Sequence, residues 1–221
     1  MVPDYPDRPE AVILDLDGTL VDTVSTRIEA WLATFAEYGI PADRDFVSSL
    51  IGADGKFVAD QVATAAGRQL TDGEDVRIDR RSGARYSALN TNPQPLPGAR
   101  EFLNELDSAG LPWAIATSSL AAQTTTSVGA LGIDRPPVIV DGTRVRRAKP
   151  APDLLLAAAT DLGREPGACW YIGDATWDML AASRAGMVAI GVTTGAASAD
   201  DLFGAGATMV VATLDEVRGW L

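Results

Sequence analysis

The fold is decided by one acidic run, Asp15-Leu16-Asp17-Gly18-Thr19-Leu20-Val21-Asp22-Thr23, at the end of the apolar segment 11–16. A continuous apolar run is typical of a strand buried on both faces, as in a parallel sheet. In extended backbone, residues i and i+2 project to the same side, so Asp15 and Asp17 can address one ligand from the end of that strand. Gly18 allows the sharp turn that follows. An acidic turn that only caps a strand is the alternative.

Short apolar runs alternate with helix-like stretches from about residue 96 onward, which is the pattern of repeated βαβ units. We therefore predict an α/β fold with a parallel sheet. The expected strands are 11–16, 112–117, 138–140, 169–173, 188–192 and 209–211. The expected helices in this part are 99–108, 120–131, 151–162, 176–185 and 199–203.

About seventy residues separate the first strand from the next strand signal, far more than an ordinary loop. This segment has helical periodicity, because Ile28, Trp31 and Phe35 share one face and Val58 and Val62 share another. The stretch 71–89 is more polar and is also expected to be helical. We predict an inserted helical domain at 22–92, with a core domain formed by 1–21 and 93–221.

Composition excludes several classes of function. The formal charge is −12 and the pI about 4.3, which argues against nucleic acid as the main partner. The 221 residues include no histidine, so histidine acid/base chemistry and histidine metal ligands are ruled out. The single cysteine, Cys169, and the lack of a long apolar run predict a cytoplasmic protein without a membrane segment.

Three later segments carry polar side chains where predicted strands end. Thr117-Ser118-Ser119 ends a strand and opens a helix, whose free N–H groups suit phosphate oxygens. Lys149 precedes a Pro-started helix, where it can be aimed at a phosphoryl group. Asp174 and Asp178 follow the strand 169–173 and are one helical turn apart. Taken singly, the first two segments are also ordinary helix starts.

Four carboxylates, those of Asp15, Asp17, Asp174 and Asp178, are thus expected at one edge of the sheet. Their mutual repulsion requires a cation or protonation. An all-oxygen set without histidine is typical of Mg²⁺, which we predict as the cofactor.

The four segments, in this order, resemble the haloacid dehalogenase superfamily, phosphatase branch, across nearly the whole chain. The resemblance implies a Rossmann-like core with a helical cap inserted after the first motif. It also implies that Asp15 is the nucleophile and that Mg²⁺ is held by Asp15, the backbone carbonyl of Asp17, and Asp174. Asp178 would orient the lysine and a water molecule.

The same resemblance assigns the phosphoryl oxygens to Lys149, Thr117, Ser118 and the turn at Gly18. Asp17 would act as general acid and then as general base, which predicts a pKa near the working pH. Its presence favours phosphoryl-oxygen chemistry over dehalogenation or phosphonate cleavage.

Two cap residues are candidates for substrate contact. Lys56 follows the glycines of the loop 50–55 and could bind an anionic tail. Arg27 lies near the position of a histidine in the related sugar-phosphate mutases, and a solvated surface residue is the equal alternative.

We therefore predict a Mg²⁺-dependent phosphatase of a small phosphorylated metabolite, of the phosphoglycolate or sugar-phosphate type, acting as a monomer or weak homodimer. A β-phosphoglucomutase-like mutase is the main alternative. A 2-haloacid dehalogenase and a non-catalytic binding module are minor ones.

Overall fold

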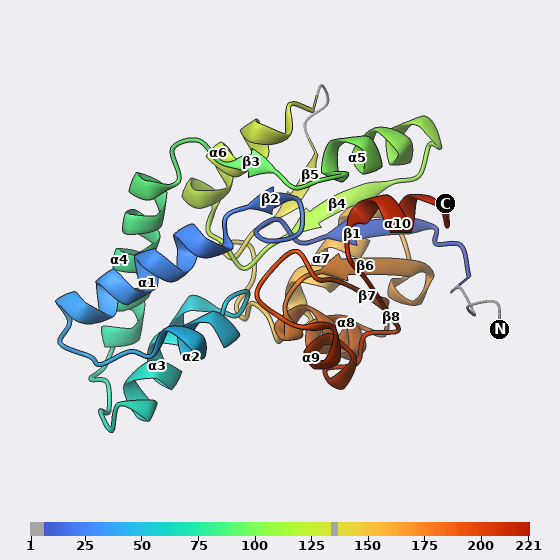
Figure 1. The fold of residues 1–221 in the computed structure, drawn as a ribbon. Helices are drawn as coiled ribbons and strands as arrows, with labels where there is room; N and C mark the ends of the chain where they lie inside the picture. Colours follow the sequence, from blue (N-terminus) through green and yellow to red (C-terminus); the bar gives the residue numbers. More distant parts are fainter. Residues whose placement is uncertain (1–6, 134–136) are drawn as a thin grey trace.

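A six-stranded sheet forms the centre of the computed structural model, which describes residues 7–133 and 137–221 (Figure 1). All neighbouring strands are parallel, in the order β5-β4-β1-β6-β7-β8. Their bounds are Ala11–Leu14 (β1), Trp113–Ala116 (β4), Val138–Val140 (β5), Cys169–Gly173 (β6), Val188–Val192 (β7) and Met209–Val211 (β8). The predicted α/β fold with a parallel sheet is confirmed.

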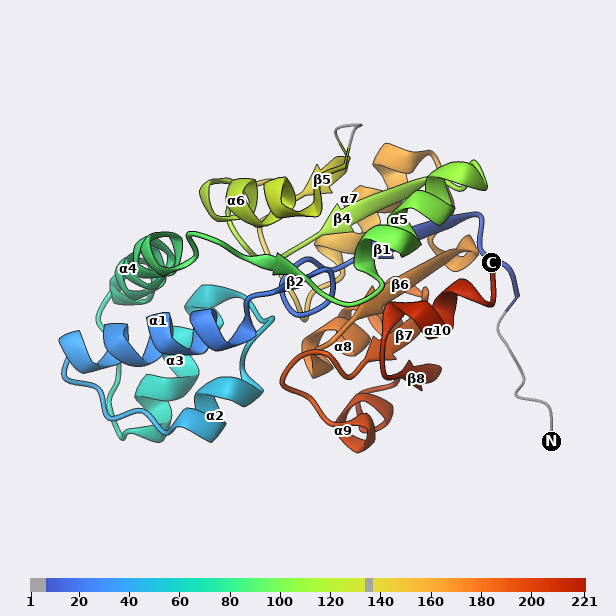
Figure 2. The same cartoon turned by 45° about the horizontal axis from the view of Figure 1, so that its top comes forward.

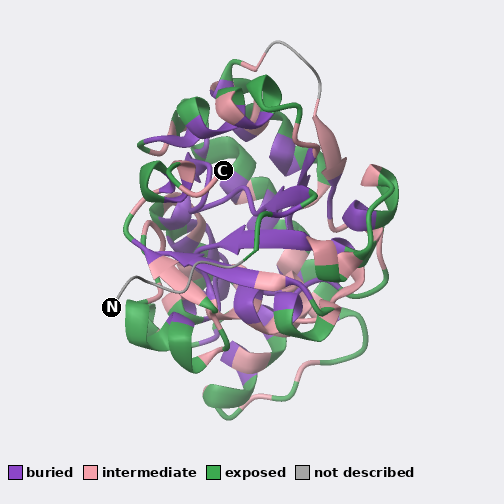
Figure 3. Cartoon of the chain, turned by 90° about the vertical axis from the view of Figure 1, so that its right-hand side faces the viewer, coloured by how far each residue is buried: buried purple, intermediate pink, exposed green. Residues whose placement is uncertain are grey.

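Each face of the sheet is covered by its own helices and its own apolar cluster. Val12 and Leu14 of β1 pack with α5 (Ala99–Ser108), α6 (Ala121–Leu131) and α10 (Leu214–Arg218). Ala11 and Ile13 face the other way, toward α7 (Asp153–Leu162), α8 (Thr176–Ala185) and α9 (Ala199–Gly204). The central strands are buried on both sides (Figure 3), which explains why they are apolar without alternation.

Four further helices lie beside the sheet (Figures 1 and 2). In the sequence they come after the short strand β2 (Val21–Asp22) and before the short strand β3 (Gln94–Pro95), and these two strands pair antiparallel. The four helices are α1 (Val24–Glu37), α2 (Arg44–Ser49), α3 (Gly55–Ala65) and α4 (Glu74–Leu89). Their apolar faces enclose a third cluster that includes Ile28, Trp31 and Phe35. We call these helices the cap. That residues 22–92 form a separate domain stays a prediction.

Several elements differ from the expected ones. The first strand ends at Leu14 rather than at residue 16, although the Asp15 N–H still donates to the Ile172 carbonyl. The helix α4 begins at Glu74 and not at residue 71, because Gly73 before it adopts a left-handed φ of 68°. The helices α2 and α10 were not predicted, since six and five residues are too short to show a helical period and, unlike the equally short α9, they do not lie between two predicted strands.

No helix within residues 7–133 and 137–221 is both long and apolar enough to cross a membrane.

Candidate active site

The candidate site lies where the strand order reverses. From β1 the chain continues to β4 and β5 on one side and to β6, β7 and β8 on the other. In open α/β sheets, ligands bind outside the carboxyl ends of the strands at such a point. Asp15, Thr117 and Asp174 directly follow β1, β4 and β6, and so the topology brings the predicted residues together.

Lys149 is fully buried and joins two of the carboxylates. Its Nζ lies 2.9 Å from Asp15 Oδ1 and donates to Asp178 Oδ1 at 2.7 Å. Asp178 is held in turn by the Tyr171 hydroxyl at 2.8 Å and by the Ala175 N–H at 2.9 Å. A buried ammonium needs this kind of pairing, since an isolated buried charge is strongly unfavourable.

Asp174 is enclosed by glycines. A Cβ at Gly18 would come within 2.4 Å of its Oδ2, and a Cβ at Gly195 within 1.7 Å. Thr19 Oγ1 donates to Asp174 Oδ1 at 3.0 Å. Because neither glycine has a side chain, there is space for the Asp174 carboxylate between them. Gly18 also adopts a left-handed φ of 84°.

Asp15, Asp174 and Asp178 are all buried, and one carboxylate oxygen of each lies within 4.8 Å of the other two. Burial raises the pKa of Asp15 to about 7, although Lys149 opposes it, and burial together with Asp178 raises that of Asp174 well above its ordinary value. Burial is the main cause and the neighbouring carboxylates add to it, so a bound cation would favour the ionised form of both groups. Carboxylates alone form an oxygen donor set, which fits Mg²⁺.

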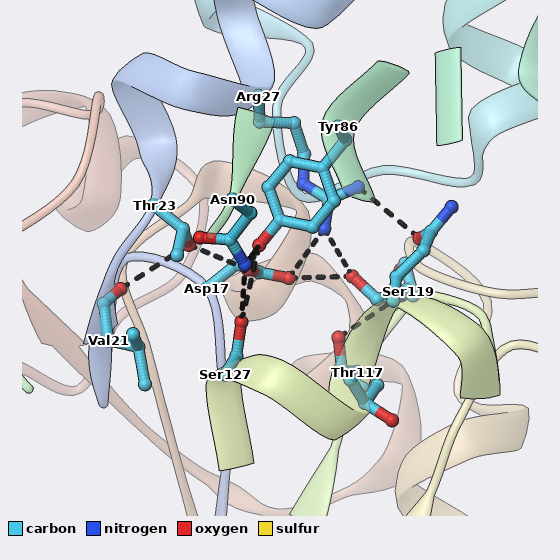
Figure 4. Close-up of polar contacts among 12 residues, drawn as sticks. Asp17, Val21, Thr23, Arg27, Tyr86, Asn90, Thr117, Ser119 and Ser127 are labelled. Atoms are coloured by element: carbon cyan, nitrogen blue, oxygen red, sulfur yellow. Dashed lines mark hydrogen bonds and ion pairs between the residues drawn. The ribbon is translucent and has the colours of Figure 1, made fainter. Parts of the chain in front are cut away.

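Asp17 lies within a ring of hydrogen-bond donors (Figure 4). Its Oδ2 accepts from Arg27 Nη2 at 2.9 Å and from Ser119 Oγ at 2.6 Å. Its Oδ1 accepts from Thr23 Oγ1 at 2.6 Å and from the Tyr86 hydroxyl at 2.8 Å. Both oxygens are therefore fully used.

The prediction of a pKa near neutrality for Asp17 was wrong for this arrangement. Burial works against its charge, but Arg27 and the hydroxyls around it outweigh that effect, and the pKa of Asp17 is lowered. The sequence showed Asp17 and Arg27 ten residues apart without indicating that they pair. Of the two alternatives for Arg27, the solvated surface residue is also wrong, since its side chain is only 13% exposed.

Besides Arg27 and Tyr86 at Asp17, three hydrogen bonds from the loops at 49–54 hold the cap closed onto the core. Ser118 Oγ donates to the Gly52 carbonyl at 2.9 Å, and the Asp54 N–H donates to the Lys149 carbonyl at 2.8 Å. Trp177 Nε1 donates to the Ser49 carbonyl at 2.9 Å. The cavity left between cap and core has a volume of about 40 Å³. That space holds only a few water molecules, so the cap must open to admit any larger ligand.

The other predicted contacts lie at different places around this cavity. Thr117 and Ser118 line it, with Asp15 and Lys149. Lys56 is 43% exposed and lines a neighbouring hollow instead. The Gly18 N–H donates to the Val21 carbonyl at 2.8 Å, so in this closed arrangement it is engaged.

Several residues of the site were missed. Tyr86 lies in the polar stretch that gave only a weak helical signal, and nothing in its spacing pointed to Asp17. Tyr171 is part of an apolar strand, where a hydroxyl is easily read as core. Ser119 and Thr23 stand inside quoted motifs and could have been found as donors for a buried carboxylate.

A family model described as haloacid dehalogenase-like hydrolase matches residues 12–192. The chain belongs to the haloacid dehalogenase-like hydrolases. This match covers β1 through β7, including every motif described above.

Curated relatives of this hydrolase include phosphatases. The "Probable phosphatase IndB" of Dickeya dadantii is 34% identical over 94% of this chain and 91% of its own. "Validoxylamine A 7'-phosphate phosphatase" of Streptomyces hygroscopicus is 33% identical over 84% and 86%. "Beta-phosphoglucomutase" of Bacillus subtilis is 32% identical over 84% of each chain. The protein is thus an enzyme, a hydrolase of phosphate monoesters.

Among solved structures, a hydrolase from Pseudomonas syringae superposes with a TM-score of 0.89 at 35% identity, covering 94% of this chain and 98% of that one. The agreement over nearly both whole chains includes the cap as well as the sheet.

Proposed function

We propose that this hydrolase is a Mg²⁺-dependent phosphatase of small metabolites that works through a phosphoenzyme on Asp15. The observation that carries the proposal is the position of Asp15, buried at the switch point of the sheet between Lys149 and Asp174. A carboxylate held at a strand end, with a fixed cation on one side and an acidic pocket on the other, can approach a phosphorus atom.

In the first step, an oxygen of Asp15 forms a bond to phosphorus as the bond to the ester oxygen breaks. Lys149 Nζ and the Thr117 hydroxyl bind the phosphoryl oxygens as negative charge accumulates on them. Asp15, Asp174 and the backbone carbonyl of Asp17 would hold Mg²⁺, which when bound supplies positive charge to the phosphoryl group and offsets the carboxylate repulsion.

Asp17 can carry a proton only after it has given up its pairing with Arg27, which keeps its pKa low in the closed structure. The leaving oxygen then takes that proton from Asp17, and Asp17 accepts one from the water that hydrolyses the phosphoenzyme. In the closed structure both oxygens of Asp17 are engaged with Arg27, Ser119, Thr23 and Tyr86. Asp17 must therefore lose some of these hydrogen bonds and contact the substrate instead when the cap closes over the bound substrate.

Hydrolysis of p-nitrophenyl phosphate with and without Mg²⁺ tests this proposal. The wild-type protein should release nitrophenol only with Mg²⁺, and Asp15→Asn should reduce the rate at least a thousandfold. Acid quenching during turnover should trap phosphate on the wild-type chain and none on Asp15→Asn. An active Asp15→Asn protein would refute the assignment of the nucleophile.

A phosphosugar mutase is the second candidate, favoured by the resemblance to the Bacillus subtilis mutase. Arg27 weakens it, because it stands near the position at which those mutases carry a histidine. Product analysis with β-glucose 1-phosphate decides between the two. We expect glucose and inorganic phosphate, whereas glucose 6-phosphate would identify a mutase.

A further inference from the structure

One charged side chain in the cavity above Asp15 has no counter-ion. Five charged groups line this cavity, those of Asp15, Asp17, Arg27, Asp79 and Lys149. Lys149 pairs with Asp15 and Arg27 pairs with Asp17. Within the described part of the chain, Asp79 makes no hydrogen bond and no ion pair, which leaves one negative charge facing the space for the substrate.

The chain makes room for this carboxylate. Asp79 lies on α4 of the cap, and a Cβ at Gly55 of α3 would come within 1.9 Å of Asp79 Oδ1. Gly55 does not adopt a left-handed φ, so its lack of a side chain serves this close approach and not a turn. Burial, and then the charge of Asp54, raise the pKa of Asp79 to about 6.

An unpaired, largely desolvated carboxylate is costly unless a ligand supplies the missing donor. The cap is also the part of this enzyme that faces the leaving group, since Asp15 and Lys149 take the phosphoryl group. Asp79 is thus placed to accept a hydrogen bond from the leaving group and to repel a leaving group that carries a carboxylate.

The two cations of the inner cavity already have carboxylate partners, since Arg27 is bound to Asp17 and Lys149 to Asp15. The cations Lys56, Arg80 and Arg146 line the outer hollow instead. That hollow shares Asp79 with the inner cavity, so a short acidic ester meets Asp79 before it reaches those cations.

We infer, on the basis of the proposed phosphatase function, that Asp79 is the specificity residue of this enzyme and selects phosphate esters whose leaving group donates a hydrogen bond. The substrate class is a polyol, sugar or amino-sugar monophosphate. Short acidic esters such as phosphoglycolate are discriminated against.

The test compares glucose 6-phosphate, glucosamine 6-phosphate and phosphoglycolate in the wild type and in Asp79→Asn. We expect kcat/KM for the hexose phosphates to fall at least tenfold in Asp79→Asn and that for phosphoglycolate to rise at least threefold, because an amide can donate to a carboxylate. The two hexose phosphates differ at one position, which shows whether a hydroxyl or an amine is the donor. The matched control is Asp75→Asn, one turn away on α4 and outside the residues that line either hollow; it should leave all three values within twofold.

The inference is overturned if Asp79→Asn changes kcat/KM for all three substrates by the same factor. It is also overturned if the wild type has a higher kcat/KM for phosphoglycolate than for the hexose phosphates. Release of nitrophenol from p-nitrophenyl phosphate reports separately on the proposed function. Should there be no turnover, calorimetry in the Asp15→Asn background still decides the matter: adding Asp79→Asn must weaken binding of the hexose phosphates at least tenfold and must not weaken that of phosphoglycolate.

Discussion

Arg27 Nη2 lies 2.9 Å from Asp17 Oδ2, while the Arg27 guanidinium carbon stacks 3.7 Å from the centre of the Tyr86 ring. The arginine comes from α1 and the tyrosine from α4, so two cap helices meet on one carboxylate of the core (Figure 4). The ion pair therefore links the closed position of the cap to the charge state of Asp17. A planar guanidinium can stack and donate at once, which a lysine cannot do equally well.

Replacing only one residue of the Arg27–Asp17 ion pair should lower the free energy of unfolding more than replacing both. Arg27→Gln leaves a buried carboxylate without its cation, and we expect a loss of about 2–4 kcal/mol in the free energy of unfolding at pH 7.5. Urea denaturation of Arg27→Gln, Asp17→Asn and the double variant measures the coupling, which should exceed about 1 kcal/mol. The pKa of Asp17 is lowered in the folded state, so the coupling is present above its ordinary range and is lost as the pH falls through the folded value. Strict additivity of the two substitutions would contradict the pairing.

Most of the fold could be predicted from the sequence, because buried strands carry a strong signal. The expected strand at 169–173 and the helices at 99–108 and 176–185 coincide with β6, α5 and α8. Helix starts were less accurate where Pro150 and Pro152 favoured an early beginning and α7 begins at Asp153. Short elements such as α2 and α10 have no period to detect.

The sequence was sufficient to predict those residues of the site that directly follow a strand. Asp15, Thr117 and Asp174 meet because parallel strands end at one edge, and that inference needs only the strand positions. The partners of Asp17 depend on how the cap is seated, and no local pattern encodes this. Asp79 illustrates the limit, since its importance rests on the absence of a side chain at Gly55.

Gly195→Ala should weaken Mg²⁺ binding without unfolding the protein. Gly195 is not in the left-handed region, so alanine suits its backbone, but the new Cβ would meet Asp174 Oδ2 at 1.7 Å and displace that carboxylate. We expect the Kd for Mg²⁺, measured by calorimetry, to rise at least tenfold. Gly129→Ala on α6 is the control, because a Cβ there meets nothing within 4 Å. Unchanged Mg²⁺ affinity in Gly195→Ala would show that Asp174 does not hold the metal.

Asp79 should make the protein less stable at neutral pH than at mildly acidic pH. Its pKa is raised from 3.8 to about 6, so the folded state binds its proton more tightly than the unfolded state does. The contribution of Asp79 to the free energy of unfolding is therefore fully present below pH 4 and is lost as the pH rises through 6. Asp79→Asn removes the effect and should be more stable than the wild type by on the order of 2 kcal/mol at pH 7.5. Urea unfolding of both proteins at pH 5 and pH 7.5 measures this difference in stability. An equal difference at the two pH values would mean that titration of Asp79 is not its cause.

Trp177→Phe should loosen the closed cap. The substitution removes the hydrogen bond from the indole to the Ser49 carbonyl but keeps an aromatic ring, which in the wild type packs edge-on against Phe57 at 5.2 Å. One such bond contributes about 0.5–1.5 kcal/mol, so the Asp54 amide, bonded to the Lys149 carbonyl across the closure, should exchange with deuterium roughly 2- to 10-fold faster. Trp113→Phe is the matched control, since it also loses an indole hydrogen bond, to Asp107, but lies in the core away from the cap. Equal exchange of the Asp54 amide in the two variants would show that the Trp177 contact does not hold the cap closed.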